Sequence, residues 1–114
     1  MTVKACDVEE FQKYLEHWSG GAVSLNSYRD DHDRLILRLE HPTASEEPVG
    51  LSLFYCTYLA GPVRWEQSAL TIKTCSRQHG ARGFELSDAT AGFVVRCASA
   101  SLYGEPEIVL PEQP

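Results

Sequence analysis

The spacing of apolar residues changes once along this chain, and that change restricts the fold more than any other feature. From Val8 to Trp18 apolar side chains recur every three or four residues, which is typical of one face of a helix. Beyond Gly21 they alternate, most plainly from Arg34 to Glu40, which is typical of half-buried strands. The pattern predicts an α+β fold in which an N-terminal helix precedes a sheet.

Capping signals support both ends of the predicted helix, residues 8–18. Asp7 is a good N-cap residue, and Glu10 stands three positions later, as in a capping box. Two glycines follow the helix, and glycine accepts the left-handed conformation that ends many helices. His17 lies in the last turn, where a cation interacts favourably with the helix dipole, so we interpret it as a mild cap and not as a catalytic group.

The alternating stretches predict about five to seven strands, and the 114 residues fit a single domain, 1–114. Connections of roughly four to ten residues are too short for crossover helices, so we expect a mostly antiparallel, meander-like sheet with the helix packed on its apolar face. A polar cluster at residues 30–33 predicts a hairpin between the first two strands. The expected strands are 22–29, 34–41, 49–58, 69–75, 83–87, 92–103 and 107–110.

Two of these strands carry further expectations. Strand 49–58 is apolar on both faces, which leaves open a barrel-like closure, a second layer or a subunit interface. We expect strand 69–75 to be its antiparallel neighbour. Strand 92–103 has Arg96 as the one charge in its interior and is a candidate edge strand, which favours a symmetric homodimer formed through sheet edges or an aromatic face.

The charge of the chain restricts its partners. It carries 16 acidic and 10 basic residues, a formal net charge of −6, and the basic residues are scattered along the sequence. Nucleic-acid binders need clustered Lys and Arg, so we expect no nucleic-acid partner, whereas an acidic surface favours a basic protein partner. The sequence contains neither a long apolar run nor an apolar leader at its start, so we expect a cytoplasmic protein without membrane contact.

The residues that carry chemistry elsewhere form no strong motif here. The four cysteines are widely spaced, and we expect reduced, mostly buried thiols. Cys75 and His79 come nearest to a zinc-ligand spacing, yet a zinc site normally shows a closer pair, so we expect no metal and no cofactor. The motifs of hydrolases, metalloproteases and nucleotide-binding proteins are absent from the sequence, although a Cys–His nucleophile pair stays open.

The stretch from Phe54 to Trp65 is rich in aromatic residues and contains an arginine. Tyr, Trp and Arg dominate binding hot spots, so this stretch is the candidate binding site. The competing interpretation is an aromatic-rich core strand followed by a turn. The candidate binding residues are Tyr55, Tyr58, Arg64 and Trp65.

These observations favour a small acidic, non-catalytic protein-interaction module. The alternative is a small-molecule-binding protein or an enzyme with a pocket between sheet and helix. The motifs do not identify a partner, a ligand or a reaction.

Overall fold

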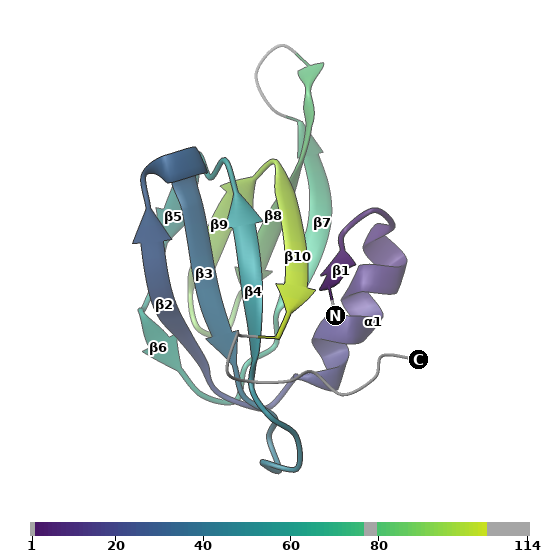
Figure 1. Ribbon diagram of the computed structural model, residues 1–114, viewed down its shortest axis with the longest axis vertical. Coiled ribbons are helices and arrows are strands. Elements are labelled where there is room, and N and C mark those ends of the chain that lie inside the picture. Colours follow the sequence, from purple (N-terminus) through teal and green to yellow (C-terminus); the bar gives the residue numbers. More distant parts are fainter. Residues whose placement is uncertain (1, 77–79, 105–114) are drawn as a thin grey trace.

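The computed structural model describes residues 2–76 and 80–104, which form one α-helix and ten strands in two sheets (Figure 1). The predicted α+β class with antiparallel strands is confirmed. The strand number is higher than the expected five to seven, and the described strands form two open sheets and no closed barrel.

The elements follow in chain order. The helix α1 spans Val8–His17, and a short 3-10 turn spans Asp31–Asp33. The strands are β1 Thr2–Lys4, β2 Val23–Arg29, β3 Arg34–Leu39, β4 Val49–Phe54, β5 Tyr58–Ala60, β6 Arg64–Trp65, β7 Thr71–Ser76, β8 Arg82–Asp88, β9 Phe93–Cys97 and β10 Ser99–Tyr103. One sheet has the order β1-β10-β4-β3-β2-β6, and the other has the order β5-β9-β8-β7.

The core lies between the two sheets, which are stacked one behind the other in Figure 1. Leu35, Leu37 and Leu39 of β3 are buried on the inner face of the six-stranded sheet, as their alternation predicts. Leu86 and Val95 of the four-stranded sheet are fully buried in the same cluster. A second sheet, and not the helix, therefore covers the apolar face of the first.

The helix closes one side of this sandwich, beside β1 and β7 (Figure 1). Asp7 caps it as predicted, since its carboxylate accepts hydrogen bonds from the backbone N–H groups of Glu9 and Glu10. Of its four predicted core side chains, Phe11, Leu15 and Trp18 are buried, and Val8 is partly buried. Our expectation that the helix packs on the sheet face is wrong, because that face is already occupied.

Gln12 joins the helix to the edge strand β7. Its side-chain Nε2 donates to Leu70 O at 3.1 Å, and its Oε1 accepts from Ile72 N at 2.9 Å. Backbone groups at a sheet edge invite pairing with another chain unless something covers them. The amide of Gln12 occupies two of these groups as a neighbouring strand would.

The sequence divides strands differently from the structure at two places. Expected strand 49–58 ends at Phe54, because Tyr55 has a φ of 57°, and β5 then continues in the other sheet. Expected strand 92–103 is two strands in different sheets, separated at Ala98. In both places apolar residues continue past the break, but the phase of their burial does not. Tyr55 is 47 % exposed, and the buried positions change from Val95 and Cys97 before Ala98 to Ala100 and Leu102 after it. β1 and β6 were not predicted, and expected strand 107–110 lies outside the described residues.

The expected pairing of strands is partly wrong. The hairpin of β2 and β3 is confirmed, and β4 continues that meander. However, β4 lies between β3 and β10, while β7 pairs with β8, so strands 49–58 and 69–75 are not neighbours. β9 lies between β5 and β8, and β10 between β1 and β4, so strand 92–103 is not an edge. The homodimer stays a prediction without this argument.

The described part of the chain offers no helix with the length and hydropathy to cross a membrane. The ten residues of α1 are half of what such a span needs, which is about 20.

Truncation of a central core side chain tests the two-sheet core. Leu37 is fully buried in β3, and Leu37→Ala should lower the free energy of unfolding by about 2 to 5 kcal/mol, because it removes apolar contacts and leaves a cavity. Asp31 is exposed, and Asp31→Ala should change the free energy of unfolding by less than about 0.5 kcal/mol. Urea denaturation of both variants measures this difference; a loss below about 1 kcal/mol for Leu37→Ala would contradict the assigned core.

Candidate metal centre

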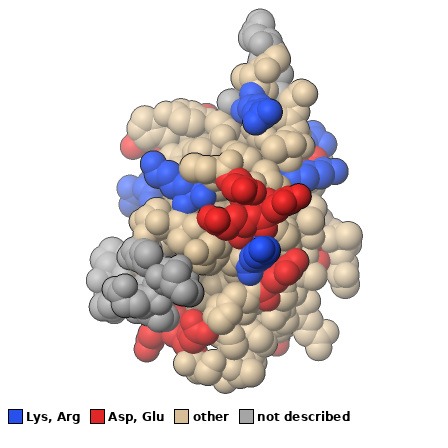
Figure 2. Space-filling view, turned by 90° about the vertical axis from the view of Figure 1, so that its right-hand side faces the viewer, with Lys and Arg blue, Asp and Glu red and all other residues tan. Residues whose placement is uncertain are grey.

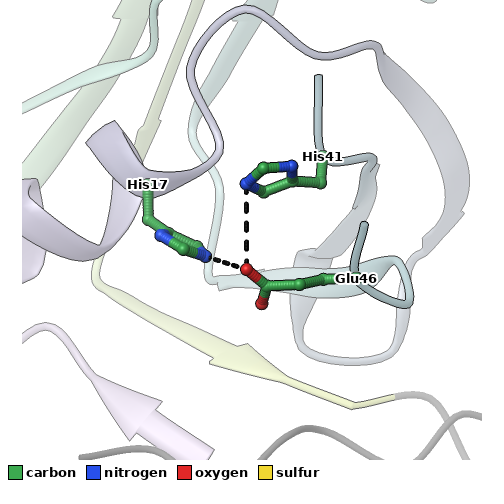
Figure 3. A group of neighbouring side chains, drawn as sticks. All are labelled: His17, His41 and Glu46. Carbon is green, nitrogen blue, oxygen red and sulfur yellow. Dashed lines mark hydrogen bonds and ion pairs between the residues drawn. The ribbon is translucent and has the colours of Figure 1, made fainter. Parts of the chain in front are cut away.

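Three side chains with metal-ligating atoms meet where α1 approaches the loop between β3 and β4, residues 40–48. His17 ends α1, His41 follows β3, and Glu46 lies in the loop (Figure 3). Glu46 Oε2 lies 2.5 Å from His17 Nε2 and 3.7 Å from His41 Nε2. One ligand atom from each residue can be chosen so that all lie within 4.8 Å of one another.

The core positions both imidazoles through Trp18. The indole is 5 % exposed, and its ring centroid lies 5.5 Å from that of His17 and 5.7 Å from that of His41, both edge-on. The two imidazole centroids are 5.0 Å apart. A close approach of backbones brings the segments together, because a Cβ on Gly21 would lie 1.7 Å from the carbonyl oxygen of Glu40.

Hydroxyl groups in the loop orient the His41 ring. His41 Nδ1 lies 2.9 Å from Thr43 Oγ1, and Thr43 donates its own hydroxyl proton to Ser45 Oγ. Thr43 Oγ1 can therefore accept a hydrogen bond from Nδ1–H, and in that tautomer the Nε2 lone pair is directed at the cluster. The Thr43 backbone N–H, 3.3 Å from Nδ1, fits the other tautomer, in which Nε2–H points at Glu46. Both states suit a site that exchanges a proton for a metal ion.

The donor set matches a transition metal. Two imidazole nitrogens and one carboxylate oxygen are common zinc ligands, with zinc–ligand distances near 2.0 to 2.2 Å and so about 3.3 Å between ligand atoms. Around the ion the distance from His17 Nε2 to Glu46 Oε2 would lengthen from 2.5 Å and that from His41 Nε2 to Glu46 Oε2 would shorten from 3.7 Å. His17 is the most exposed of the three, with 51 % of its side chain accessible, and has room for this movement. A cavity of about 320 Å³ beside the cluster is lined by Glu40, His41, Ala44, Ser45, Glu46, Glu47 and Pro48.

Sequence reasoning missed this cluster. We looked for ligands at short spacings and considered Cys75 with His79; Cys75 is half-buried, and His79 lies outside the described residues. His17 and His41 are 24 positions apart and belong to no metal motif. His17 lies in the last turn of α1 as predicted, and its side chain is hydrogen-bonded to the carboxylate of Glu46.

The four predicted binding residues occupy different surroundings. Tyr55 and Tyr58 are each 47 % exposed; the hydroxyl of Tyr55 lies 3.1 Å from His32 Nδ1, and the ring of Tyr58 lies under the Arg96 guanidinium. Arg64 is exposed on β6, at the edge of the six-stranded sheet. Their role in binding stays a prediction.

Trp65 makes internal contacts. Its ring is tilted against Phe93 with centroids 4.7 Å apart, and its Nε1 donates to Asp88 Oδ2 at 2.8 Å. Asp88 is buried and also accepts from the backbone N–H groups of Ala69 and Ala91. The side chain of Asp88 thus ties the segment 65–69 to the turn after β8.

Removing the Asp88 carboxylate should destabilise the protein. Asp88→Ala leaves the indole N–H of Trp65 and the N–H of Ala69 without their acceptor, so we expect a loss of about 2 to 4 kcal/mol in the free energy of unfolding. Chemical denaturation followed by tryptophan fluorescence measures it. Glu66→Ala removes a carboxylate at an exposed position near Trp65 and is the matched control, which should have little effect on stability. An equal loss of unfolding free energy in both variants would show that the hydrogen bonds of Asp88 do not stabilise the fold.

The cysteines do not favour a nucleophile. Cys56 is half-buried, and burial, reinforced by the nearby Asp33 carboxylate, raises the pKa of its thiol to about 11. At neutral pH that thiol is almost entirely protonated, whereas catalytic cysteines need the thiolate. Our expectation of mostly buried thiols is correct for Cys97 alone, because Cys6 is exposed and Cys56 and Cys75 are half-buried.

Differential alkylation tests the state of Cys56. At about pH 8, iodoacetamide should modify exposed Cys6 much faster than Cys56, because the Cys56 thiolate is scarce below a pKa of about 11. Peptide mass spectrometry after timed quenching gives both rates in one sample. Cys56 reacting first would contradict the raised pKa.

Comparisons with models of protein families, with curated proteins and with solved structures found no match to this chain.

Proposed function

We propose that this protein is a small, non-catalytic binding module that holds a divalent transition-metal ion, zinc in the first place, between the end of α1 and the loop 40–48. The observation that carries the proposal is the set of three ligand atoms from His17, His41 and Glu46 within 4.8 Å of one another. The ion takes the place now held by the proton between His17 Nε2 and Glu46 Oε2.

The chemistry of the donors favours zinc over the common hard cations. Imidazole nitrogen suits zinc, copper and nickel, whereas magnesium and calcium prefer shells made of oxygen. The hydroxyl of Thr43 lies beside the other ring nitrogen of His41, where hydrogen-bonding groups commonly orient the histidines that ligate zinc. Three protein ligands leave one tetrahedral position for water or for a donor atom of a partner.

Binding would join two parts of the fold that are distant in sequence. The loop connects β3 to β4 in the middle of the six-stranded sheet, and His17 belongs to the helix that closes its side. A ligand that binds only the folded chain stabilises it by about 2.7 kcal/mol at a free concentration one hundred times its Kd. The ion thus serves as a cross-link at the surface, and the open position makes the loop suitable for metal-dependent contact with a partner.

The packing of the core favours a site at the loop and not the alternative, a pocket between sheet and helix. Side chains from both sheets and from α1, among them Phe11, Leu15, Leu53 and Ile72, pack into one continuous core. The described cavity of about 320 Å³ lies at the loop instead.

Calorimetric titration of the chelator-treated protein tests the proposal. Zinc should bind with a stoichiometry of one ion per chain and raise the Tm, and magnesium should do neither at equal concentration. His41→Ala and Glu46→Gln should each weaken zinc binding by more than about tenfold, because even the loss of a group that only hydrogen-bonds to a ligand costs that much. His32→Ala and Glu47→Gln, the same changes at exposed positions outside the cluster, are the matched controls.

Zinc affinity should also depend on pH. Metal ligands bind in their deprotonated form, so the apparent affinity should fall as the pH is lowered. Binding that is equally strong for all four variants, or unchanged at lower pH, would place the ion elsewhere and refute the proposed site.

A further inference from the structure

Strand β7 is the long edge strand of this fold. Within the described residues the strands at sheet edges are β1, β6, β5 and β7; the first three have two or three residues each, and β7 has six. Short edge strands and bulges protect a sheet against pairing with other chains. The part of β2 that extends beyond β6 has such a bulge, between Leu25 and Ser27. The edge best suited to pair with another strand is therefore that of β7.

The hydrogen bonds of Gln12 show which backbone groups of β7 point away from β8. Ile72 N–H donates to Gln12 Oε1, and Leu70 O accepts from Gln12 Nε2. In an antiparallel strand the N–H and C=O groups of every second residue point to the same side. The N–H and C=O groups of Thr74 and Ser76 therefore also point away from β8, on the open edge.

Gln12 covers only the first half of this edge. Figure 1 shows α1 beside β7 and the hairpin of β7 and β8 extending past the other strands. Thr74 and Ser76 are exposed, and no group of the described residues bonds to their outward N–H and C=O groups. The second half of β7 thus presents two donors and two acceptors of a strand without a neighbour.

We propose that this edge pairs with the same edge of a second copy of the chain, antiparallel about a two-fold axis at Cys75. Thr74 then lies opposite Ser76 of the partner subunit, and the outward N–H groups of each copy donate to the outward C=O groups of the other. Because the edge offers donors and acceptors in equal number, it is complementary to itself, as a two-fold contact requires. The contact begins after Ile72, so Gln12 keeps both of its hydrogen bonds.

The charges of the hairpin allow this contact. Its described charged side chains are Lys73, Arg82 and Glu85, besides buried Asp88, and Lys73 Nζ lies 3.3 Å from the Glu85 carboxylate. None of them lies opposite its own copy across the axis, where like charges would be destabilising; that position belongs to uncharged Cys75. Figure 2, which faces the side where α1 lies, shows carboxylates gathered at its centre and none on the end of the hairpin that projects at the top.

Sedimentation equilibrium of the full chain tests the inference, which goes beyond metal binding. The contact is small, so we expect a Kd between about 1 μM and 1 mM, with an average mass that rises from 12.7 kDa toward twice that value as the concentration increases. A chelator in the buffer removes any dimer bridged by a metal ion. The result is therefore independent of the proposed metal site.

Thr74→Pro removes an edge N–H group from each copy and should weaken the dimer by about tenfold or more, because two hydrogen bonds are lost. Thr74→Ala keeps the N–H group and should dimerise like the unchanged protein. Proline is tolerated at edge positions whose N–H faces solvent, so the circular dichroism spectrum should show a folded chain in both variants.

A second variant does not depend on how β7 accepts proline. Cys75→Lys places like charges directly opposite each other across the axis and should weaken the dimer severalfold. Cys6→Lys makes the same change at an exposed cysteine outside β7 and should leave the dimer unchanged.

Cross-linking tests the register of the two strands. Cys75 and Cys75 of the partner subunit form a non-hydrogen-bonded pair, whose Cα atoms are about 4.5 Å apart, within the range that a disulfide spans. With Cys6 replaced by Ala, oxidation by diamide should give a dimer that reductant separates and that peptide mass spectrometry shows to be linked through Cys75. Thr74→Pro should lower its yield.

Three outcomes would overturn the inference. One is a monomer at all concentrations up to about 1 mM, which would leave the edge of β7 to an extended segment of another protein. Another is a dimer that Thr74→Pro and Cys75→Lys weaken no more than their matched controls do. The third is cross-linking through a cysteine other than Cys75, which would place the contact elsewhere.

Discussion

The contact between two apolar sheet faces is the interaction on which the rest of this structure depends. Leu37 and Leu51 on one sheet and Leu86 and Val95 on the other are completely removed from water. Each such side chain contributes roughly 1.5 to 3 kcal/mol, whereas an exposed ion pair contributes about 1 kcal/mol or less. The burial of these faces therefore determines how the sheets stack, and the helix takes the side that the two sheets leave open.

Polar groups inside this arrangement are paired with backbone that would otherwise lack a partner. Gln12 completes the hydrogen bonds of β7 from the helix, and Asp88 receives an indole and two backbone N–H groups. A buried polar group without a partner costs free energy, so these hydrogen bonds fix the positions of the helix and of the segment around Trp65. Trp18 is held in the core by the same packing of the helix, and it contacts the two histidines of the candidate metal site.

Local physics made part of the fold predictable. The helix with its Asp7 cap and the hairpin of β2 and β3 depend on residues close in sequence, and both appear where their patterns indicate. The failures share one cause. At Tyr55 and Ala98 the chain passes from one sheet to the other within a continuous run of apolar and strand-forming residues, and inward positions on both sides of each break contact one core. A period of two identifies an inner face without identifying the sheet to which it belongs.

The sequence by itself determined the helix, its cap, most strand segments and the inner faces of β3 and β4, since these follow from spacing over a few residues. Only the tertiary structure decided which strands pair, and every surface feature with a chemical consequence depends on that pairing. His17, His41 and Glu46 meet because the loop after β3 lies against the end of α1. The second half of β7 has an open edge because β7 pairs with β8 alone and Gln12 covers only the first half. Strand order is set by the contacts of residues far apart in the chain, and local periodicity carries no information about them.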